Sequence, residues 1–175
     1  FRKLSNRKNI KSKKRDYIKN LYPALCNTKN GEIYGYIDEK GNFIIEPKFD
    51  RAYDFTSKGV AIVTENGLDG LINLEGNYVI PPIYDSLSPF VERKSIFVQN
   101  GKMGAIDEEG NVVTKNLYSI IGNFSEGRAV VGESKSNGYK YGYIDGEGRE
   151  VIPLKYENAD DFRDGVALVK IKENK

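Results

Sequence analysis

Residues 70–85 read Gly-Leu-Ile-Asn-Leu-Glu-Gly-Asn-Tyr-Val-Ile-Pro-Pro-Ile-Tyr-Asp, and this stretch indicates the fold. Two short apolar runs, at 71–72 and 78–80, flank a polar segment that contains Asn73 and Gly76. An Asx residue with glycine three positions later suits a type I turn closed by a bulge. The prolines at 81 and 82 end the second run, because proline cannot donate to a strand ladder. The stretch therefore predicts two antiparallel strands joined by a tight turn.

The same pattern occurs four times along the chain. A Gly-x-Ile-Asp/Asn element begins at Gly35, Gly70, Gly104 and Gly142, with spacings of 35, 34 and 38 residues. A second glycine follows each of these anchor glycines by six residues, and a phenylalanine follows by twenty. These residues are Gly41, Gly76, Gly110 and Gly148, and Phe55, Phe90, Phe124 and Phe162. Agreement at so many fixed offsets identifies an internal repeat.

Local sequence predicts a third strand in each unit. Asn-Gly pairs at 66–67, 100–101, 137–138 and 30–31 fit two-residue type I′ turns, whose central residues both need positive φ. Each turn would join a preceding strand, such as Val60 to Val63, to the Gly-x-Ile strand. A connection of about fifteen residues then leads to the next unit, long enough that packing must order part of it. The recurrent phenylalanines, with an aromatic residue at offset fourteen, are expected to form the core between repeats.

The sequence therefore predicts an all-β fold, a tandem array of about four three-stranded antiparallel meander repeats. The array is expected to be open and twisted, with a closed propeller-like ring as the alternative. Residues 1–20 are expected to form a basic arm or linker with weak helical spacing, and residues 21–175 the repeat domain. That domain divides into a partial repeat at 21–34 and copies at 35–69, 70–103, 104–141 and 142–175. Both ends of the repeat pattern look cut from a longer array, and the chain reads as a piece of a longer protein.

Composition excludes several kinds of site. There is no histidine, which excludes Ser-His-Asp and Cys-His nucleophiles and histidine-ligated zinc. The single cysteine, Cys26, excludes an intrachain disulfide and a CxxC metal site. No apolar run approaches the roughly 20 residues that a membrane-spanning helix needs. We therefore expect neither a metal nor a cofactor.

Charge is divided unevenly along the chain. Residues 1–30 carry ten Lys or Arg and one acid, Asp16, whereas the remainder carries an excess of seven acidic residues. The arm could contact an anionic membrane surface, bind nucleic acid or serve as a solvated linker. Nucleic acid is the least favoured, because the acidic body has no groove of interleaved basic and aromatic residues. Localisation stays open between an envelope-associated site and the cytoplasmic face of a membrane, the latter if an upstream anchor exists.

A family resemblance rests on two motifs. One is the Gly-x-Ile-Asp-x-x-Gly-x-x-Val-Ile-Pro-Pro-x-Tyr-Asp run, best kept in residues 70–85, and the other is Phe-x-x-Gly-x-Ala-x-Val, as at 162–169. Together they resemble the bacterial WG-containing (KWG) β-repeat family over residues 21–175. The chain departs from the family at the tryptophan position, which holds Tyr34, Asp69, Met103 and Tyr141, and copy three lacks the Ile-Pro-Pro step. The resemblance implies a fold, and an interaction or envelope-associated role without common catalytic residues.

The recurrent carboxylates have a structural explanation. Asp38, Asp107 and Asp145 stand where an Asx turn needs a side-chain oxygen. The cluster of Asp160, Asp161 and Asp164 lacks the ligand spacing of a calcium loop. A glycosidase-like pair of carboxylates stays open as an alternative, because no motif selects which two acids would be close in space.

Copy-specific tyrosines are the candidate ligand-binding residues. Tyr34 and Tyr36 alternate about Gly35, and Tyr141 and Tyr143 alternate about Gly142, so each pair is expected on one face of its strand. Such a platform could stack on sugar rings or anchor a protein partner. The alternative is that these rings pack beneath a neighbouring connection as part of the core.

We therefore expect a non-catalytic binding or scaffolding module, with protein–protein interaction in a bacterial envelope-associated protein as its role. The first alternative is a carbohydrate or cell-wall binding module, and the second is a hydrolase that uses a carboxylate pair.

Overall fold

The structure is a computed structural model that describes residues 20–171. The basic arm expected at the N-terminus falls on residues 1–19 and lies outside the described residues. No helix among the residues described is long and apolar enough to cross a membrane. Strands account for all the regular secondary structure of this region, as the repeat pattern predicts.

Seventeen strands follow one another within residues 20–171. They are β1 (Tyr22–Thr28), β2 (Gly31–Ile37), β3 (Phe43–Phe49), β4 (Arg51–Ala52), β5 (Val60–Glu65), β6 (Leu68–Asn73), β7 (Tyr78–Tyr84), β8 (Ser86–Leu87), β9 (Lys94–Gln99), β10 (Lys102–Asp107), β11 (Val112–Tyr118), β12 (Ile120–Ile121), β13 (Arg128–Lys135), β14 (Gly138–Asp145), β15 (Glu150–Tyr156), β16 (Asn158–Ala159) and β17 (Val169–Lys170).

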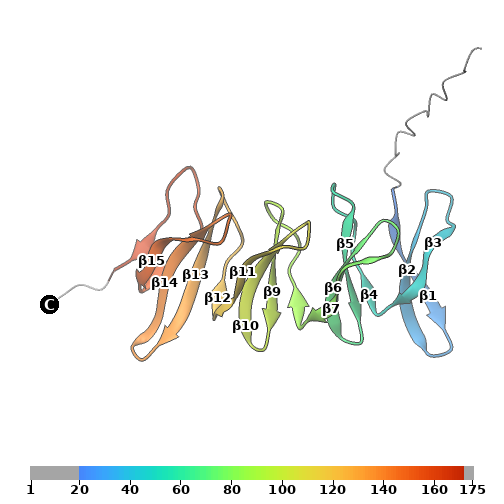
Figure 1. Cartoon of the computed structure of the whole chain (residues 1–175), viewed down its shortest axis with the longest axis horizontal. Helices are drawn as coiled ribbons and strands as arrows, with labels where there is room; N and C mark the ends of the chain where they lie inside the picture. Colours follow the sequence, from blue (N-terminus) through green and yellow to red (C-terminus); the bar gives the residue numbers. More distant parts are fainter. Residues whose placement is uncertain (1–19, 172–175) are drawn as a thin grey trace, which may run out of the picture.

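The strands form a row of small antiparallel sheets. Their orders are β1-β2-β3, β4-β5-β6-β7, β8-β9-β10-β11 and β12-β13-β14-β15, followed by the pair β16-β17. The expected three-stranded meander is present in each of the first four sheets. In the second to fourth sheets a two-residue strand from the preceding connection adds a fourth strand, which sequence patterning did not predict. The sheets succeed one another along the long axis, with the first and last at opposite ends (Figure 1), so the array is open.

The hairpin turns follow the prediction in two of four sheets. Asn66 and Gly67 have φ of 53° and 77°, and Asn100 and Gly101 have φ of 55° and 71°, as a type I′ turn requires. The prediction is wrong for the hairpins β1–β2 and β13–β14. Their two-residue loops are 29–30 and 136–137, because Thr28 pairs with Gly31 and Lys135 pairs with Gly138. In these two copies the Asn-Gly pair lies one residue farther from the anchor glycine, so the strand register moves Asn-Gly off the turn.

The second turn of each unit is closed by a side chain, as expected. The N–H of Gly41 donates to the carbonyl of Asp38 over 3.0 Å, and Gly41 has φ of 83°. The Oδ1 atom of Asp38 accepts from the backbone N–H groups of Lys40 and Asn42. Equivalent bonds form at the other copies, on Asn73, Asp107 and Asp145. The recurrent Asx residues are therefore elements of the turns.

The anchor glycines are required by a close backbone crossing. A Cβ on Gly35, Gly70 or Gly142 would lie 2.3–2.6 Å from a carbonyl oxygen of the third strand of the same sheet. Strand pairing is irregular at this point, with a register shift on either side of the residue after each anchor glycine. The third strand therefore bends across the central strand where only glycine leaves room.

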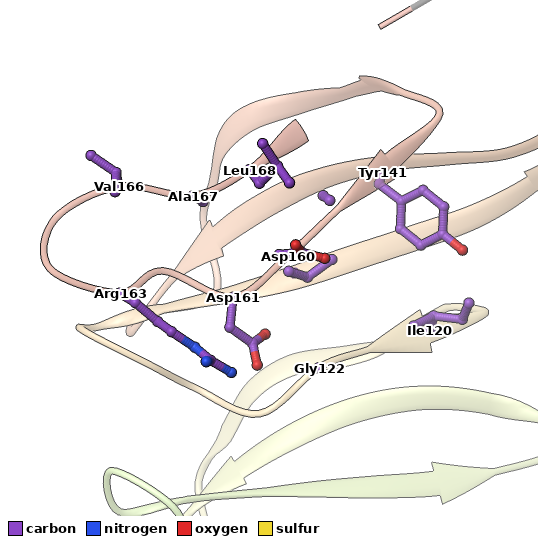
Figure 2. Close-up of a pocket in the computed structure, with 11 residues that line it drawn as sticks. Ile120, Gly122, Tyr141, Asp160, Asp161, Arg163, Val166, Ala167 and Leu168 are labelled. Carbon is purple, nitrogen blue, oxygen red and sulfur yellow. The ribbon is translucent and has the colours of Figure 1, made fainter. Parts of the chain in front are cut away.

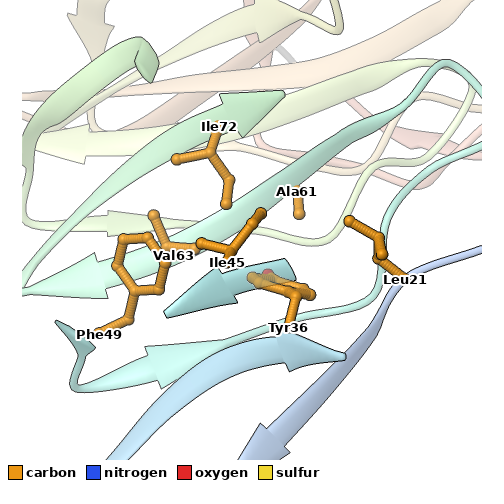
Figure 3. Packing of buried hydrophobic residues seen from close by; sticks show 7 residues of the cluster. All are labelled: Leu21, Tyr36, Ile45, Phe49, Ala61, Val63 and Ile72. Atoms are coloured by element: carbon orange, nitrogen blue, oxygen red, sulfur yellow. The ribbon is translucent and has the colours of Figure 1, made fainter. Parts of the chain in front are cut away.

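Apolar side chains fill the space between successive sheets. Figure 3 shows the first of three such clusters, in which Tyr36, Ile45 and Phe49 of the first sheet meet Val63 and Ile72 of the second. The next cluster joins the second sheet to the third, and the last joins the third to the fourth. Central strands are consequently buried on both faces, as the burial of three consecutive residues in β6, β10 and β14 shows. This layered packing is how each repeat acquires a core.

The recurrent aromatic residues lie in this core, as expected. Phe124 and Phe49 are buried, and Phe55 packs on Tyr36 with ring centroids 4.7 Å apart. Phe162 makes the equivalent contact with Tyr143 at 5.0 Å. Phe55 and Phe162 therefore each cover the central strand of the sheet that precedes them in the array.

Candidate functional site

The four candidate tyrosines divide into two classes. Tyr36 and Tyr143 are 0% and 1% exposed, so the prediction that they bind a ligand is wrong. Their hydroxyls donate to the backbone carbonyls of Tyr53 and Asp160, over 2.7 and 2.8 Å. Burial raises the pKa of both phenols above the ordinary value. Because the sheets are stacked, the face that would be open in a single sheet is covered by the following connection.

Tyr34 and Tyr141 occupy the tryptophan position of the repeat and are half-buried. Tyr34 packs against the cluster between the first and second sheets, so it contributes to the core. In the copies without an aromatic residue, the same position holds the following short strand. The carboxylate of Asp69 accepts from the Leu87 N–H over 2.8 Å, and the Met103 sulfur accepts from the Ile121 N–H over 3.3 Å.

Tyr141 is the candidate that lines a cavity. Its ring stacks on Tyr139 with centroids 6.1 Å apart and planes 27° apart. The ring also lies over Gly132, its cross-strand partner, where an added Cβ would come within 2.9 Å of it. Glycine at 132 thus lets the aromatic ring lie flat on the sheet. The ring on which it stacks is accessible, since Tyr139 is 43% exposed.

A groove of about 670 Å³ opens beside Tyr141, between the fourth sheet and the segment that carries β16 and β17 (Figure 2). We call it the Tyr141 groove. Its apolar wall comes from β12, β13 and the C-terminal segment, and its polar side comes from the loop after β16. The lining residues are Ile120, Gly122, Val130, Tyr141, Ala159, Asp160, Asp161, Arg163, Val166, Ala167 and Leu168.

Gly122 opens the groove. It stands at a repeat offset where the other copies carry Tyr53, Ser88 and Asp160. A Cβ at Gly122 would meet the Oδ1 atom of Asp161 at 3.2 Å, so a larger side chain would intrude on the carboxylate. Sequence reasoning missed this residue, although a glycine at an offset where no other copy has one was a visible signal.

The polar side of the groove carries charges of both signs. Asp160, Asp161 and Arg163 form no ion pair with other described residues. Figure 2 shows Asp161 and Arg163 in the loop after β16, and Asp161 lies beside Gly122. An aromatic face, an apolar wall, a carboxylate and a guanidinium can together recognise a ligand by stacking and by charge-assisted hydrogen bonds.

A smaller groove repeats this arrangement within the array. It measures about 370 Å³ and lies between the connections that follow the first and second sheets, with Tyr53, Ile62, Leu87 and Phe90 among its lining residues. Tyr53, Ile62 and Leu87 stand at the repeat positions of Gly122, Val130 and Ala159. The larger side chains Tyr53 and Leu87 explain the smaller volume, so the groove is a property of the repeat and its size is copy-specific.

The turn carboxylates do not assemble into a site. Hydrogen bonds, led by the one from the Asn42 N–H, hold the pKa of Asp38 below its ordinary value. Among residues 20–171 no cluster of three or more His, Cys, Asp or Glu side chains is arranged to hold a metal ion. The described carboxylates at these turns are committed to backbone N–H groups.

Comparison with known proteins agrees with this architecture. The WG containing repeat family matches the chain four times, at residues 34–68, 70–102, 103–133 and 141–175. No curated protein matches it. Each match begins at or next to an anchor glycine or the tryptophan position before it. Since the four matches cover most of the chain, the protein belongs to the family of WG-containing repeat proteins.

Proposed function

We propose that this WG-repeat array is a non-catalytic binding module that recognises a protein partner through the Tyr141 groove. The observation that carries the proposal is the combination of a half-exposed tyrosine stack with Arg163 and Asp161 on the rim of an apolar groove. Tyrosine and arginine are the residues on which protein interfaces most depend. The apolar wall, which includes Ile120, Val130 and Leu168, suits an apolar anchor residue of a partner.

A carbohydrate is the second candidate ligand, and a specific observation favours it. Tyr141, which stacks on Tyr139, lines the groove together with the two carboxylates Asp160 and Asp161. Aromatic faces pack on sugar rings, and carboxylates accept hydrogen bonds from their hydroxyls. We keep the protein partner first because the groove wall is mainly apolar and carries an arginine.

The test is a selection for ligands whose binding depends on the groove. Displayed random peptides and an array of immobilised glycans would be probed with the full chain and with Tyr141→Ala. We expect peptides that lose binding to Tyr141→Ala and to Arg163→Ala, while Tyr53→Ala retains it. Tyr53 is a matched control because it is an exposed tyrosine at the edge of the smaller groove.

The outcomes separate the candidates. Glycans that bind the full chain and not Tyr141→Ala would favour the carbohydrate over the protein partner. Ligands that bind Tyr141→Ala and Arg163→Ala as well as the unaltered chain would contradict the groove as the binding site. Thermal melts of each variant would establish that the fold is retained.

A further inference from the structure

The last strand of each of the first four sheets is an edge strand. β3, β7, β11 and β15 each stand last in the order of their sheets, so one side of each has no strand partner among the described residues. Unpaired edge strands attract other strands, and proteins commonly block them with proline. β3 carries Pro47, β7 carries Pro81 and Pro82, and β15 carries Pro153. β11 has Thr114-Lys115-Asn116 in their place and contains no proline.

Comparison with β7 shows which N–H groups β11 gains because it has Lys115 and Asn116 where β7 has proline. β7 and β11 pair with their inner strands in the same register, with Ile80 and Thr114 in one equivalent pair and Tyr84 and Tyr118 in the other. β7 keeps this pairing although Pro81 and Pro82, which have no N–H, stand at the positions of Lys115 and Asn116. The N–H groups of Lys115 and Asn116 are therefore not required by the inner ladder, and because successive N–H groups of a strand point to opposite sides, one of the two is free to face the edge of the third sheet.

Exposed apolar side chains flank these two donors. Val112 is 54% exposed and Leu117 is 61% exposed. At the position of Leu117, β3 and β15 carry Lys48 and Lys155, whose ammonium groups lie over aromatic rings at 5.0 and 5.2 Å. The edge of β11 therefore lacks both of the features, proline and a lysine beside the aromatic residue, that cover the edges of the first and fourth sheets.

Lys115 gives this edge a charge preference. Its side chain is exposed and forms no ion pair with the other described residues. It lies between the two exposed apolar residues, so a partner strand along β11 would place a side chain near its ammonium group. A carboxylate there is attracted, whereas a second copy of β11 would bring two Lys115 ammonium groups onto adjacent strands of one sheet.

We infer that β11 accepts an extended segment of a partner protein as an added β-strand, and that this segment carries a carboxylate between apolar residues. A backbone carbonyl of the segment would accept from the outward-facing N–H group of Lys115 or Asn116, and its apolar side chains would cover Val112 and Leu117. The surface is separate from the Tyr141 groove. The inference rests on the proposed function only in taking the partner to be a protein.

The experiment restores the missing proline. Random peptides displayed on phage would be selected on the full chain and counter-selected on Lys115→Pro, which copies the residue that β7 and β15 carry at this position. We expect enriched peptides with Asp or Glu between apolar residues, and binding weakened by at least about tenfold in Lys115→Pro or in Asn116→Pro, whichever removes the outward-facing N–H donor. Asn116→Pro copies Pro47 and Pro82, and thermal melts would show that each variant keeps the fold.

A charge reversal distinguishes strand addition from simple charge attraction. Lys115→Glu keeps the N–H group, so it should still bind strands but should select Lys or Arg in place of Asp or Glu. Lys135→Glu, an exposed lysine on β13, is the matched control and should leave the selected sequences unchanged.

Three results would overturn the inference. One is a set of enriched peptides that bind Lys115→Pro and Asn116→Pro as tightly as the unaltered chain. Another is a set without the central acidic residue. The third is a dimer, seen by sedimentation, that Lys115→Pro dissociates, since the occupant would then be a second copy of the chain. Peptides whose binding is lost in Tyr141→Ala and kept in the Lys115 variants would support the proposed function and contradict only strand addition at β11.

Discussion

The glycine before Tyr143 shows how one missing side chain permits the strand crossing of the repeat. A Cβ on Gly142 would lie 2.3 Å from the carbonyl oxygen of Ile152, which is backbone and cannot rotate away. Gly146, four residues later in the same sheet, has nothing closer than 3.9 Å to such a Cβ. The two glycines therefore differ in the space that each leaves for a methyl group.

We predict that Gly142→Ala lowers the free energy of unfolding by about 1–3 kcal/mol, because the third strand must shift to admit the methyl group. Gly146→Ala should change it by less than about 0.5 kcal/mol. Urea denaturation of the two variants measures the difference. Equal values for both would show that the crossing tolerates a side chain.

The buried phenol of Tyr36 makes the stability of the fold depend on pH in the alkaline range. Burial, the largest cause, raises the pKa of this phenol above the value of about 10 that it has in an unfolded chain. Above that pH the unfolded state loses the phenol proton while the folded state keeps it. The folded state then binds more protons, so stability falls as pH rises beyond about 10.

Tyr36→Phe should therefore change the pH dependence of stability. At neutral pH it should cost about 0.5–1.5 kcal/mol, because the carbonyl of Tyr53 loses its hydrogen bond. As the pH rises above about 10 the cost should shrink, since phenylalanine does not titrate. Melting temperatures measured between neutral and alkaline pH would test this. A difference between the two proteins that stays constant with pH would contradict it.

At the scale of elements, hydrogen bonds connect the turns of neighbouring repeats. The connections contain tight turns at Glu92–Arg93, Glu126–Gly127 and Asp164–Gly165, all with positive φ. The carboxylate of Glu92 accepts from the N–H groups of Glu126 and Gly127 over 2.7 and 2.9 Å. The carboxylate of Glu126 in turn accepts from the Gly165 N–H over 2.8 Å. The second and third of these turns are thus each held by a carboxylate of the turn before it.

We predict that Glu92→Ala lowers the free energy of unfolding by about 0.5–1.5 kcal/mol, because two backbone donors lose their acceptor. Glu75→Ala is the control, since the Glu75 side chain is exposed in a turn of another repeat. It should change stability by less than about 0.5 kcal/mol. Chemical denaturation compares the two. A loss for Glu92→Ala no larger than that for Glu75→Ala would contradict a stabilising role of the turn-to-turn bonds.

At the scale of the whole molecule, the array is held together by contacts between adjacent sheets. Ile72 belongs to the cluster between the first and second sheets, and Ile144 to the cluster between the third and fourth. Both side chains are fully buried. Among the described residues each cluster joins only two adjacent sheets. The stability of each sheet is therefore expected to depend on its contacts with the adjacent sheets.

We predict that Ile72→Ala and Ile144→Ala each cost about 2–5 kcal/mol locally, and at different ends of the array. Native-state hydrogen exchange should show lost protection in the first two sheets for Ile72→Ala and in the last two for Ile144→Ala. Protection lost uniformly over all sheets in either variant would show that the array unfolds as one cooperative unit.

Sequence alone predicted the repeat, its three strands and the closing Asx turns, because these depend on residues within a few positions of one another. Asp38 and Gly41 make their turn whatever surrounds them. Sequence also identified Tyr141 as a ligand-binding candidate, because it departs from the residues of the middle copies.

Tertiary structure decided which side chains are accessible. Tyr36 and Tyr143 alternate with Tyr34 and Tyr141 as predicted, yet the connection that covers them comes from residues 17 positions later, so their burial cannot be read from strand alternation. The Tyr141 groove and the open edge of β11 likewise depend on the stacking of sheets and on their strand order. Local sequence specifies turns and strands, whereas burial is set by elements distant along the chain.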